Sequence, residues 1–237
     1  MKQSIYTIHT LLILCSICTF WGCNKTFLGD QGTFEEDIYL NYQTKTDLEL
    51  PFKNEWYIFH GGRTHQHGGH HFITWGLGQR YAIDIVIFVN GKSHSGNGSK
   101  NEDYYCFDQP LYAPGAGKVI EVENNIEDNI PGELNENPNL SSGNYVMIDH
   151  LNGEYSILAH IKKGTVIVSV GDTVVQGQEL GKTGNSGNST EAHLHYQLQN
   201  SSNSTYSTGL PAQFKDYYAD GKFIGKGELI KGQIVRK

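Results

Sequence analysis

Cysteine, positive charge and long hydrophobic runs are all scarce in this sequence. Its 237 residues include 4 Cys, and 18 Lys and Arg stand against 25 Asp and Glu, for a net charge of −7. Nucleic-acid binding requires clustered positive charge to neutralise phosphates, so this balance excludes a generic nucleic-acid-binding protein. Outside the N-terminus there is no long apolar run, which excludes a body embedded in a membrane.

The single long apolar run covers residues 5–21 and is followed by Gly22 and Cys23. Its length and its lack of acidic residues predict a secretory signal over residues 1–22. Cys23 after a small residue resembles the lipidation site of bacterial lipoproteins, although Phe20 stands where that motif prefers Leu. We expect an exported lipoprotein of the cell envelope, anchored at Cys23. Ordinary signal cleavage and an uncleaved anchor are the alternatives.

Export would leave few cysteines. Cys15 and Cys18 lie inside the apolar run, so the mature chain would keep Cys23 and Cys106. With Cys23 acylated, one thiol remains, and it cannot form an internal disulfide framework. Stability must therefore come from a hydrophobic core or from a bound metal.

The rest of the chain is typical of an all-β protein. Short apolar or alternating runs are separated by turn signals, and no segment keeps a helical period over three turns. We predict a single antiparallel β-sheet or sandwich domain over residues 51–220, after a polar tether at 24–50 and before a C-terminal tail at 221–237. The predicted strands are residues 55–60, 81–89, 117–123, 144–150, 154–161, 165–170 and 193–199.

Two polar stretches, residues 93–103 and 124–143, are rich in Gly and Asn and poor in core-forming residues. We interpret them as long loops. Loops of this length are uncommon in compact domains and often border a binding groove, although surface padding is equally compatible with the composition.

His193 and His195 form a His-x-His pair inside a predicted strand. Residues two apart on a strand point to the same face, so both imidazoles would project into one space. Two neutral imidazoles on one face suit Zn²⁺. The alternative is a pair of half-exposed strand histidines without a ligand.

Three further signals concern ionisable residues. Asp84 lies in an apolar strand, where an unpaired carboxylate is costly, so it binds either a cation or a structural hydrogen-bond donor. His160 closes a strand and alone indicates nothing. Five histidines crowd into one segment, which is either a metal-scavenging tract or the source of one ligand for a preformed site. They are His60, His65, His67, His70 and His71.

Two common catalytic motifs are absent from the sequence. The Gly-Lys-Thr at 181–183 is not a phosphate-binding loop, because three residues rather than four separate Gly177 from Gly181 and no helical pattern follows. The sequence also has no HExxH, which excludes a thermolysin-like helical zinc site.

Taken in order, these segments resemble the LytM/lysostaphin-type zinc peptidoglycan endopeptidases. The resemblance covers about residues 51–199, and the Gly-rich turn followed by His-x-His is its most specific part. It rests on Tyr81-Ala82-Ile83-Asp84 and on the segments 111–122, 144–150, 158–160 and 171–199.

The resemblance implies a role for each matching residue. Asp84 and His195 match the family's metal-binding Asp and His, and His160 and His193 match its two catalytic histidines, which are not ligands. The family's remaining ligand is a His four residues before the Asp, where this sequence has Arg80. A guanidinium stays protonated and offers no lone pair, so Arg80 cannot take that place.

Either the site is degenerate, or a histidine from the segment 60–71 supplies the third ligand. Some relatives resemble this chain in having Gln-Arg-Tyr-Ala before the Asp and a His about a dozen residues earlier. We therefore predict His71 as the ligand, with His70 as the second choice, because catalytic zinc needs three protein ligands.

The resemblance implies an exported metalloendopeptidase with one Zn²⁺ per chain that hydrolyses peptide stems or cross-links of peptidoglycan. A zinc-activated water would attack the peptide bond, and His193 and His160 would move the proton and stabilise the oxyanion. Two alternatives remain. One is a degenerate envelope protein that binds murein or a partner enzyme, and the other is a His-rich lipoprotein whose metal is cargo.

Overall fold

The computed structural model describes residues 39–64, 77–134, 137, 140–203 and 206–237. The predicted signal peptide, Cys23, His70 and His71 lie outside these residues. Within the described part of the chain, no helix has the length and apolarity to cross a membrane.

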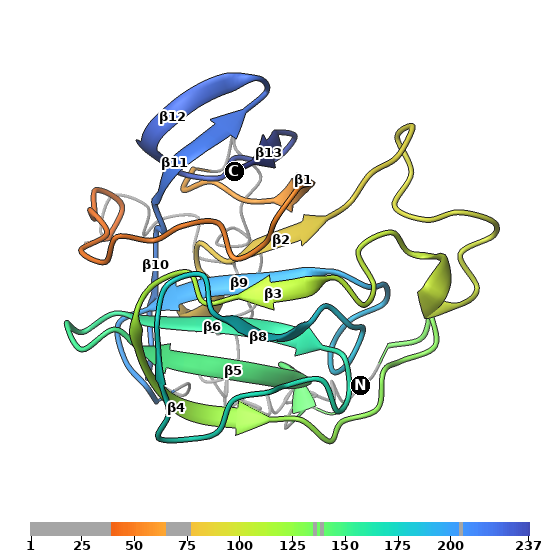
Figure 1. The fold of residues 1–237 in the computed structure, drawn as a ribbon, viewed down its shortest axis with the longest axis horizontal. Helices are drawn as coiled ribbons and strands as arrows, with labels where there is room; N and C mark the ends of the chain where they lie inside the picture. The colour runs from red at the N-terminus through yellow and green to blue at the C-terminus, as the bar shows by residue number, and fades with distance from the viewer. Residues whose placement is uncertain (1–38, 65–76, 135–136, 138–139, 204–205) are drawn as a thin grey trace, which may run out of the picture.

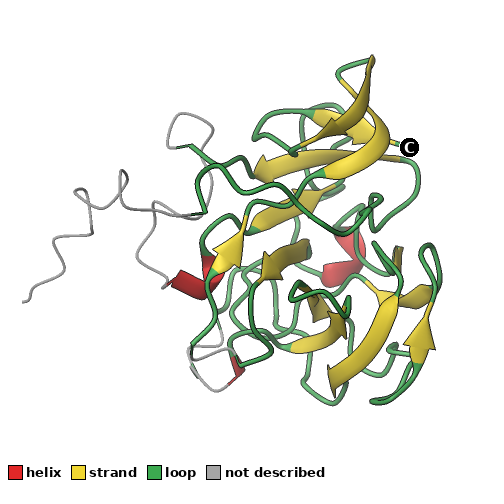
Figure 2. Cartoon of the chain, turned by 90° about the vertical axis from the view of Figure 1, so that its left-hand side faces the viewer, coloured by secondary structure: helices red, strands yellow, loops and turns green. Residues whose placement is uncertain are grey.

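Strands dominate the described residues (Figures 1 and 2). The helices η4 and η5 are three-residue 3-10 turns. The elements are β1 (Glu55–His60), η4 (Leu77–Gln79), β2 (Ile83–Val86), η5 (Asn101–Asp103), β3 (Pro110–Tyr112), β4 (Gly117–Glu123), β5 (Asn144–Asp149), β6 (Tyr155–Ile161), β7 (Thr173–Val174), β8 (Glu179–Lys182), β9 (Leu194–Gln199), β10 (Gly209–Leu210), β11 (Phe214–Ala219), β12 (Lys222–Gly227) and β13 (Ile234–Arg236).

The main sheet runs in the order β12-β11-β13-β1-β2-β9-β6-β5-β4-β7, and every pairing in it is antiparallel (Figure 1). β10 pairs with the end of β9 beyond β2, and β3 and β8 form a separate two-stranded sheet. The prediction of an all-β antiparallel fold with long loops is confirmed. The order places β2, β9 and β6 side by side, and these strands carry Asp84 and the histidines of interest.

One predicted strand, residues 165–170, is wrong. These residues form no strand. Their backbone makes a hydrogen bond to β8, from the Ile167 N–H to the Leu180 carbonyl, and at Val166 it is bonded by the side chain of Asn124. Asn124 accepts a hydrogen bond from the backbone N–H of Val166 through Oδ1 and donates one to its carbonyl through Nδ2. These two side-chain hydrogen bonds satisfy the Val166 backbone without a ladder.

β9 is buried on both faces, and the two faces differ in chemistry. Every residue of β9 is buried. Those that pack into the main hydrophobic core are Leu194, Tyr196 and Leu198. Because side chains alternate along a strand, the remaining residues lie on the opposite face. They are His195, Gln197 and Gln199, so this face of the strand is polar although it is shielded from water.

The predicted domain boundaries differ from the structure at both ends. Residues 39–50 fall in the predicted tether, yet Leu48 is fully buried in the core and pairs with Phe214. Residues 221–237 fall in the predicted tail, yet they include β12 and β13, and β13 pairs with β1 inside the main sheet. Both segments read as polar because each contributes few apolar residues to a core built by the other strands.

Glu154 attaches the segment 42–46 to the domain. Its buried carboxylate accepts hydrogen bonds from the Tyr42 hydroxyl, the Lys45 N–H, and the N–H and hydroxyl of Thr46. Burial alone would raise the pKa of Glu154, but these donors outweigh burial and hold the pKa below its usual value. The ionised carboxylate therefore stabilises the folded chain at neutral pH.

Replacing Glu154 with Gln is expected to lower the free energy of unfolding at pH 7 by roughly 3 kcal/mol, because donors are left without an acceptor. The folded pKa lies below the unfolded value of about 4.3, so the difference should shrink as pH falls below that value. Urea denaturation at pH 7 and under acid checks this, with the exposed Glu179→Gln as control. A loss that is the same at both pH values would contradict the prediction.

Candidate metal centre

Two neighbouring strands bring a carboxylate and an imidazole together. Asp84 on β2 and His195 on β9 are direct partners in the antiparallel ladder, and Asp84 Oδ1 lies 2.9 Å from His195 Nδ1. Asp84 is 8% exposed and His195 is 6% exposed. The predicted pair is therefore close and shielded from solvent, as a buried carboxylate requires.

A register shift in β6 turns His160 toward the same place. Asn144 pairs with Ile161 and Val146 with Leu158, so β6 carries one residue more than β5 over this step. Leu158 and Ile161 both pack into the main core. His160 is the extra residue, with a φ of +59° that non-glycine residues seldom adopt. This local strain directs the imidazole away from the core.

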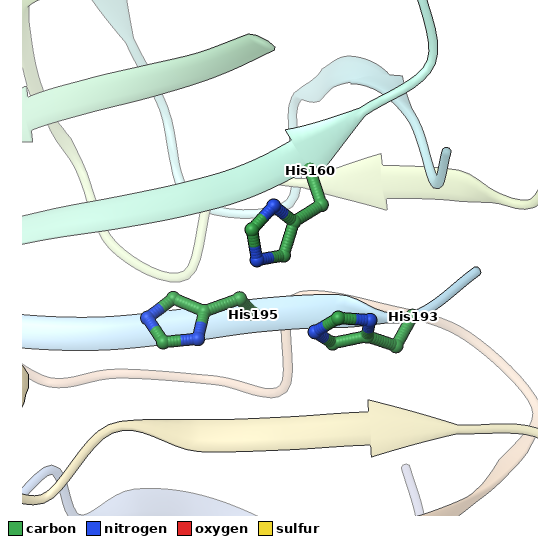
Figure 3. Close-up of side chains that lie close together, drawn as sticks. All are labelled: His160, His193 and His195. Carbon is green, nitrogen blue, oxygen red and sulfur yellow. The ribbon is translucent and has the colours of Figure 1, made fainter. Parts of the chain in front are cut away.

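Three histidine rings, those of His160, His193 and His195, converge at the site (Figure 3). The ring of His160 points from the end of β6 toward the rings of His193 and His195, with ring centres 4.7 and 5.5 Å away respectively. One nitrogen from each of the three rings lies within 4.8 Å of the others. His193 Nε2 also lies 3.6 Å from Asp84 Oδ1.

Backbone carbonyls fix which nitrogen of two rings carries the proton. His160 Nδ1 lies 2.8 Å from the Ser186 carbonyl, and His193 Nδ1 lies 2.9 Å from the Glu191 carbonyl. A carbonyl can only accept, so both Nδ1 atoms donate. In the neutral rings the lone pair is then on Nε2, free to bind a metal or to accept a proton.

His195 is flanked by two acceptors. Its Nδ1 faces Asp84 Oδ1, and its Nε2 lies 3.1 Å from Gln197 Oε1. A neutral imidazole has only one N–H, so it cannot donate to both. The Asp84–His195 contact therefore requires either a second proton or a cation between the two groups. This donor set of carboxylate and imidazole fits Zn²⁺.

The pKa shifts agree with a site for a cation. Burial lowers the pKa of His160 well below its usual value, and the neighbouring rings of His193 and His195 lower it further. Burial also lowers the pKa of His193. For His195 burial acts in the same direction, but the hydrogen bond and charge of Asp84 outweigh it and raise the pKa. His160 and His193 are thus neutral at pH 7, the form that acts as a ligand or a base.

A fourth histidine, His60, reaches Asp84 from β1. The register shifts between Ile58 and His60, which sets His60 opposite Asp84 while Ile58 stays opposite Ile85 in the core. His60 Nδ1 lies 3.0 Å from Asp84 Oδ2. Asp84 therefore uses one oxygen toward His195 and His193 and the other toward His60. The sequence placed His60 in the histidine-rich segment without assigning it this contact.

Both predicted long loops bind the Gly-rich turn that precedes His193. Asn129 donates from Nδ2 to the carbonyls of Gly187 and Ser189, and Asn185 Nδ2 donates to Asn101 Oδ1. Ser189 Oγ in turn lies 3.2 Å from His193 Nδ1. The loops at 93–103 and 124–143 are thus connected by hydrogen bonds to the turn that carries His193.

The structure brings together four of the predicted site residues: Asp84, His160, His193 and His195. His71, the predicted third ligand, lies outside the described residues. Sequence reasoning missed Gln197, which the alternation His-x-His-x-Gln could have placed on the same face as the histidines.

The sequence is similar to a known peptidase family. Residues 103–207 match Peptidase family M23. His160, His193 and His195 lie inside this segment and Asp84 lies before it.

Two curated relatives are the peptidoglycan DD-endopeptidase ShyA of Vibrio cholerae serotype O1 and the uncharacterized lipoprotein YgeR of Escherichia coli K12. The first is 34% identical over 89 residues, 38% of this chain and 17% of the relative. The second is 31% identical over 90 residues, 38% of this chain and 30% of the relative. The matches thus span less than a third of either relative.

Solved structures that match the chain include the catalytic domain of the antimicrobial peptidase lysostaphin from Staphylococcus simulans, with 19% identity and a TM-score of 0.37. That match covers 66% of this chain and 88% of the lysostaphin domain. Another is the catalytic domain, in a mutant form, of the prophage-encoded M23 protein EnpA from Enterococcus faecalis, with 18% identity and a TM-score of 0.41. It covers 69% of this chain and 93% of the EnpA domain.

Proposed function

We propose that the protein is an exported zinc metalloendopeptidase that hydrolyses peptide bonds of peptidoglycan. The match of residues 103–207 to Peptidase family M23 supports this proposal. The observation that carries the proposal is the convergence of the His160, His193 and His195 imidazoles, two of which, His193 and His195, also lie beside the Asp84 carboxylate. The similarity to ShyA, a peptidoglycan DD-endopeptidase, supports the substrate class.

We assign Asp84 and His195 as protein ligands of one Zn²⁺. Asp84 Oδ1 and His195 Nδ1 face one another, and each has its other polar atom occupied by His60 or Gln197. When bound, zinc activates water for attack on a carbonyl and polarises that carbonyl.

His160 and His193 act on the substrate rather than on the metal. Their Nδ1 atoms donate to fixed carbonyls, so their Nε2 atoms are held at the site with lone pairs available. A neutral ring takes a proton from the attacking water and passes it to the leaving amine. A protonated ring donates to the oxygen on which negative charge develops. Burial excludes competing water and strengthens both interactions.

The third ligand is a histidine of the segment 60–71, and we propose His71. Arg80, where the family's first ligand would stand, offers no lone pair. His60 contacts Asp84 Oδ2, whereas His195 contacts Oδ1, which suits a residue that orients the carboxylate.

The alternative is a degenerate envelope protein that binds murein or a partner enzyme without zinc. The replacement of a ligand by Arg80 is the observation that favours it. It predicts no zinc retention and no cleavage.

We also propose export and lipid anchoring at Cys23, which places the protein in the cell envelope together with its substrate. The apolar run at residues 5–21 supports export, and the similarity to the lipoprotein YgeR is consistent with anchoring. A Cys23→Ser variant that still fractionates with membranes would contradict the anchor.

The proposed function is tested by zinc analysis followed by digestion. Protein purified without chelator or added metal is expected to hold about one zinc per chain. It should release soluble fragments from purified peptidoglycan, and a chelator should stop the release. A protein that holds no zinc even after zinc addition would favour the degenerate alternative.

A further inference from the structure

A chain of side-chain hydrogen bonds runs along the polar face of β9, from His195 to a backbone carbonyl. His195 Nε2 lies 3.1 Å from Gln197 Oε1, Gln197 Nε2 lies 2.7 Å from Gln199 Oε1, and Gln199 Nε2 lies 2.6 Å from the Ser201 carbonyl. The residues are two apart, as expected for one face of a strand. The side chains of His195, Gln197 and Gln199 thus form one continuous chain of hydrogen bonds.

The direction of this chain is fixed at its far end. The Ser201 carbonyl can only accept, so the Gln199 amide must present Nε2 to it and Oε1 to Gln197. Gln197 must then present Nε2 to Gln199 and Oε1 to His195. An acceptor facing His195 Nε2 requires a proton on that nitrogen, which leaves the lone pair on Nδ1, toward Asp84.

Burial makes the reversed arrangement costly. Gln199 is fully buried and Gln197 is 8% exposed, so water cannot replace a lost partner for most of their polar atoms. Reversing either amide would set two donors or two acceptors against each other and leave a buried polar group unsatisfied, which is unfavourable because water cannot replace the lost partner.

We propose that Gln197, held by Gln199, is a positioning residue that keeps the proton on Nε2 of His195 and thereby presents the Nδ1 lone pair to the metal. The proposal rests on the proposed function for its use, because only a bound metal needs that lone pair. The tautomer itself is a property of the metal-free protein. Neither glutamine contacts substrate in this role.

The first test needs no variant. In the metal-free wild-type protein, in alkaline buffer, a long-range ¹H–¹⁵N spectrum is expected to show His195 protonated on Nε2 and bare on Nδ1. A spectrum with the proton on Nδ1 would overturn the proposal, whatever the protein's zinc content or activity. This readout therefore separates failure of the inference from failure of the proposed function.

The second test measures Zn²⁺ affinity by competition with a chromophoric chelator. Gln197→Leu, which removes the acceptor, is expected to weaken zinc binding about 10- to 100-fold. Gln197→Glu keeps an acceptor for His195 and should stay within a few-fold of wild type. The matched control is Gln213→Leu, which removes another buried glutamine whose side chain donates to Tyr42 rather than to the site.

A third variant covers the case in which Gln197→Leu does not fold. Gln199→Leu leaves Gln197 beside His195 but frees its amide to rotate, so the spectrum should show a mixture of both His195 tautomers. Wild-type zinc affinity in Gln197→Leu, or an unmixed spectrum in Gln199→Leu, would overturn the proposal. Equal weakening in Gln213→Leu would do so as well, because the effect would then be general loss of packing.

Discussion

Replacing His193 with Ala is expected to lower kcat about 10²- to 10⁴-fold while zinc stays near one per chain. The reason lies in the hydrogen bonds. His193 Nδ1 is committed to the Glu191 carbonyl, so the ring offers only Nε2, and in the proposed mechanism this nitrogen exchanges a proton with the reacting groups. His160→Ala should behave in the same way, since the Ser186 carbonyl holds its Nδ1. Peptidoglycan turnover and elemental analysis on the same preparation check both effects.

The matched control is His195→Ala, which removes a ring on the same strand. Because His195 Nδ1 faces Asp84, this variant is expected to lose zinc and activity together. Loss of zinc from His160→Ala or His193→Ala would contradict the assignment. It would instead make the three converging histidines the ligands, an arrangement that their mutual distances within 4.8 Å also permit.

The strands that carry the site were predictable, because their patterns are strong. β1 matches the predicted residues 55–60, and β6 and β9 each differ from the predicted 154–161 and 193–199 by one residue. β2, which carries Asp84, was predicted over 81–89 and covers only residues 83–86. Asp84 also carried its own signal, since a carboxylate inside an apolar strand needs a partner. Partners two apart on one strand, such as His193 and His195, follow from alternation alone.

Contacts that depend on a register shift were not predictable from the residue pattern, and only the family resemblance assigned His160 to the site. His160 faces the site because β6 carries an extra residue there, and His60 meets Asp84 because β1 does the same after Ile58. Strict alternation would send His160 into the core beside Leu158. A shift of one residue reverses the faces, and no local pattern in the sequence marks it.

The C-terminal strands were missed for a different reason. β12 is rich in Lys and Gly and has no fully buried residue, so its segment was interpreted as part of a tail. The connection between β11 and β12, Asp220-Gly221, is the kind of dipeptide that favours a two-residue hairpin turn, and both residues have positive φ. That turn could have been used to predict the β11–β12 hairpin. The pairing of β13 with β1 could not be predicted, since it joins residues about 180 positions apart.

Replacing His71 with Ala is expected to reduce zinc from about one per chain to near zero, because catalytic zinc requires three protein ligands and Arg80 cannot supply one. The matched control is His60→Ala. Because His60 contacts Asp84 Oδ2, whereas His195 contacts Oδ1, loss of His60 loosens the carboxylate without removing a ligand. Its zinc affinity should fall by no more than the roughly 10- to 100-fold typical of an outer partner.

The two variants together identify the third ligand. If His60→Ala loses zinc and His71→Ala keeps it, then His60 itself is the third ligand. The register shift in β1, which sets His60 opposite Asp84, would then supply the ligand that Arg80 cannot. If both keep zinc and activity, neither histidine is needed and the proposed ligand set is wrong. Only a selective loss in His71→Ala supports the proposal, because it shows that the histidine-rich segment supplies the ligand that position 80 lacks.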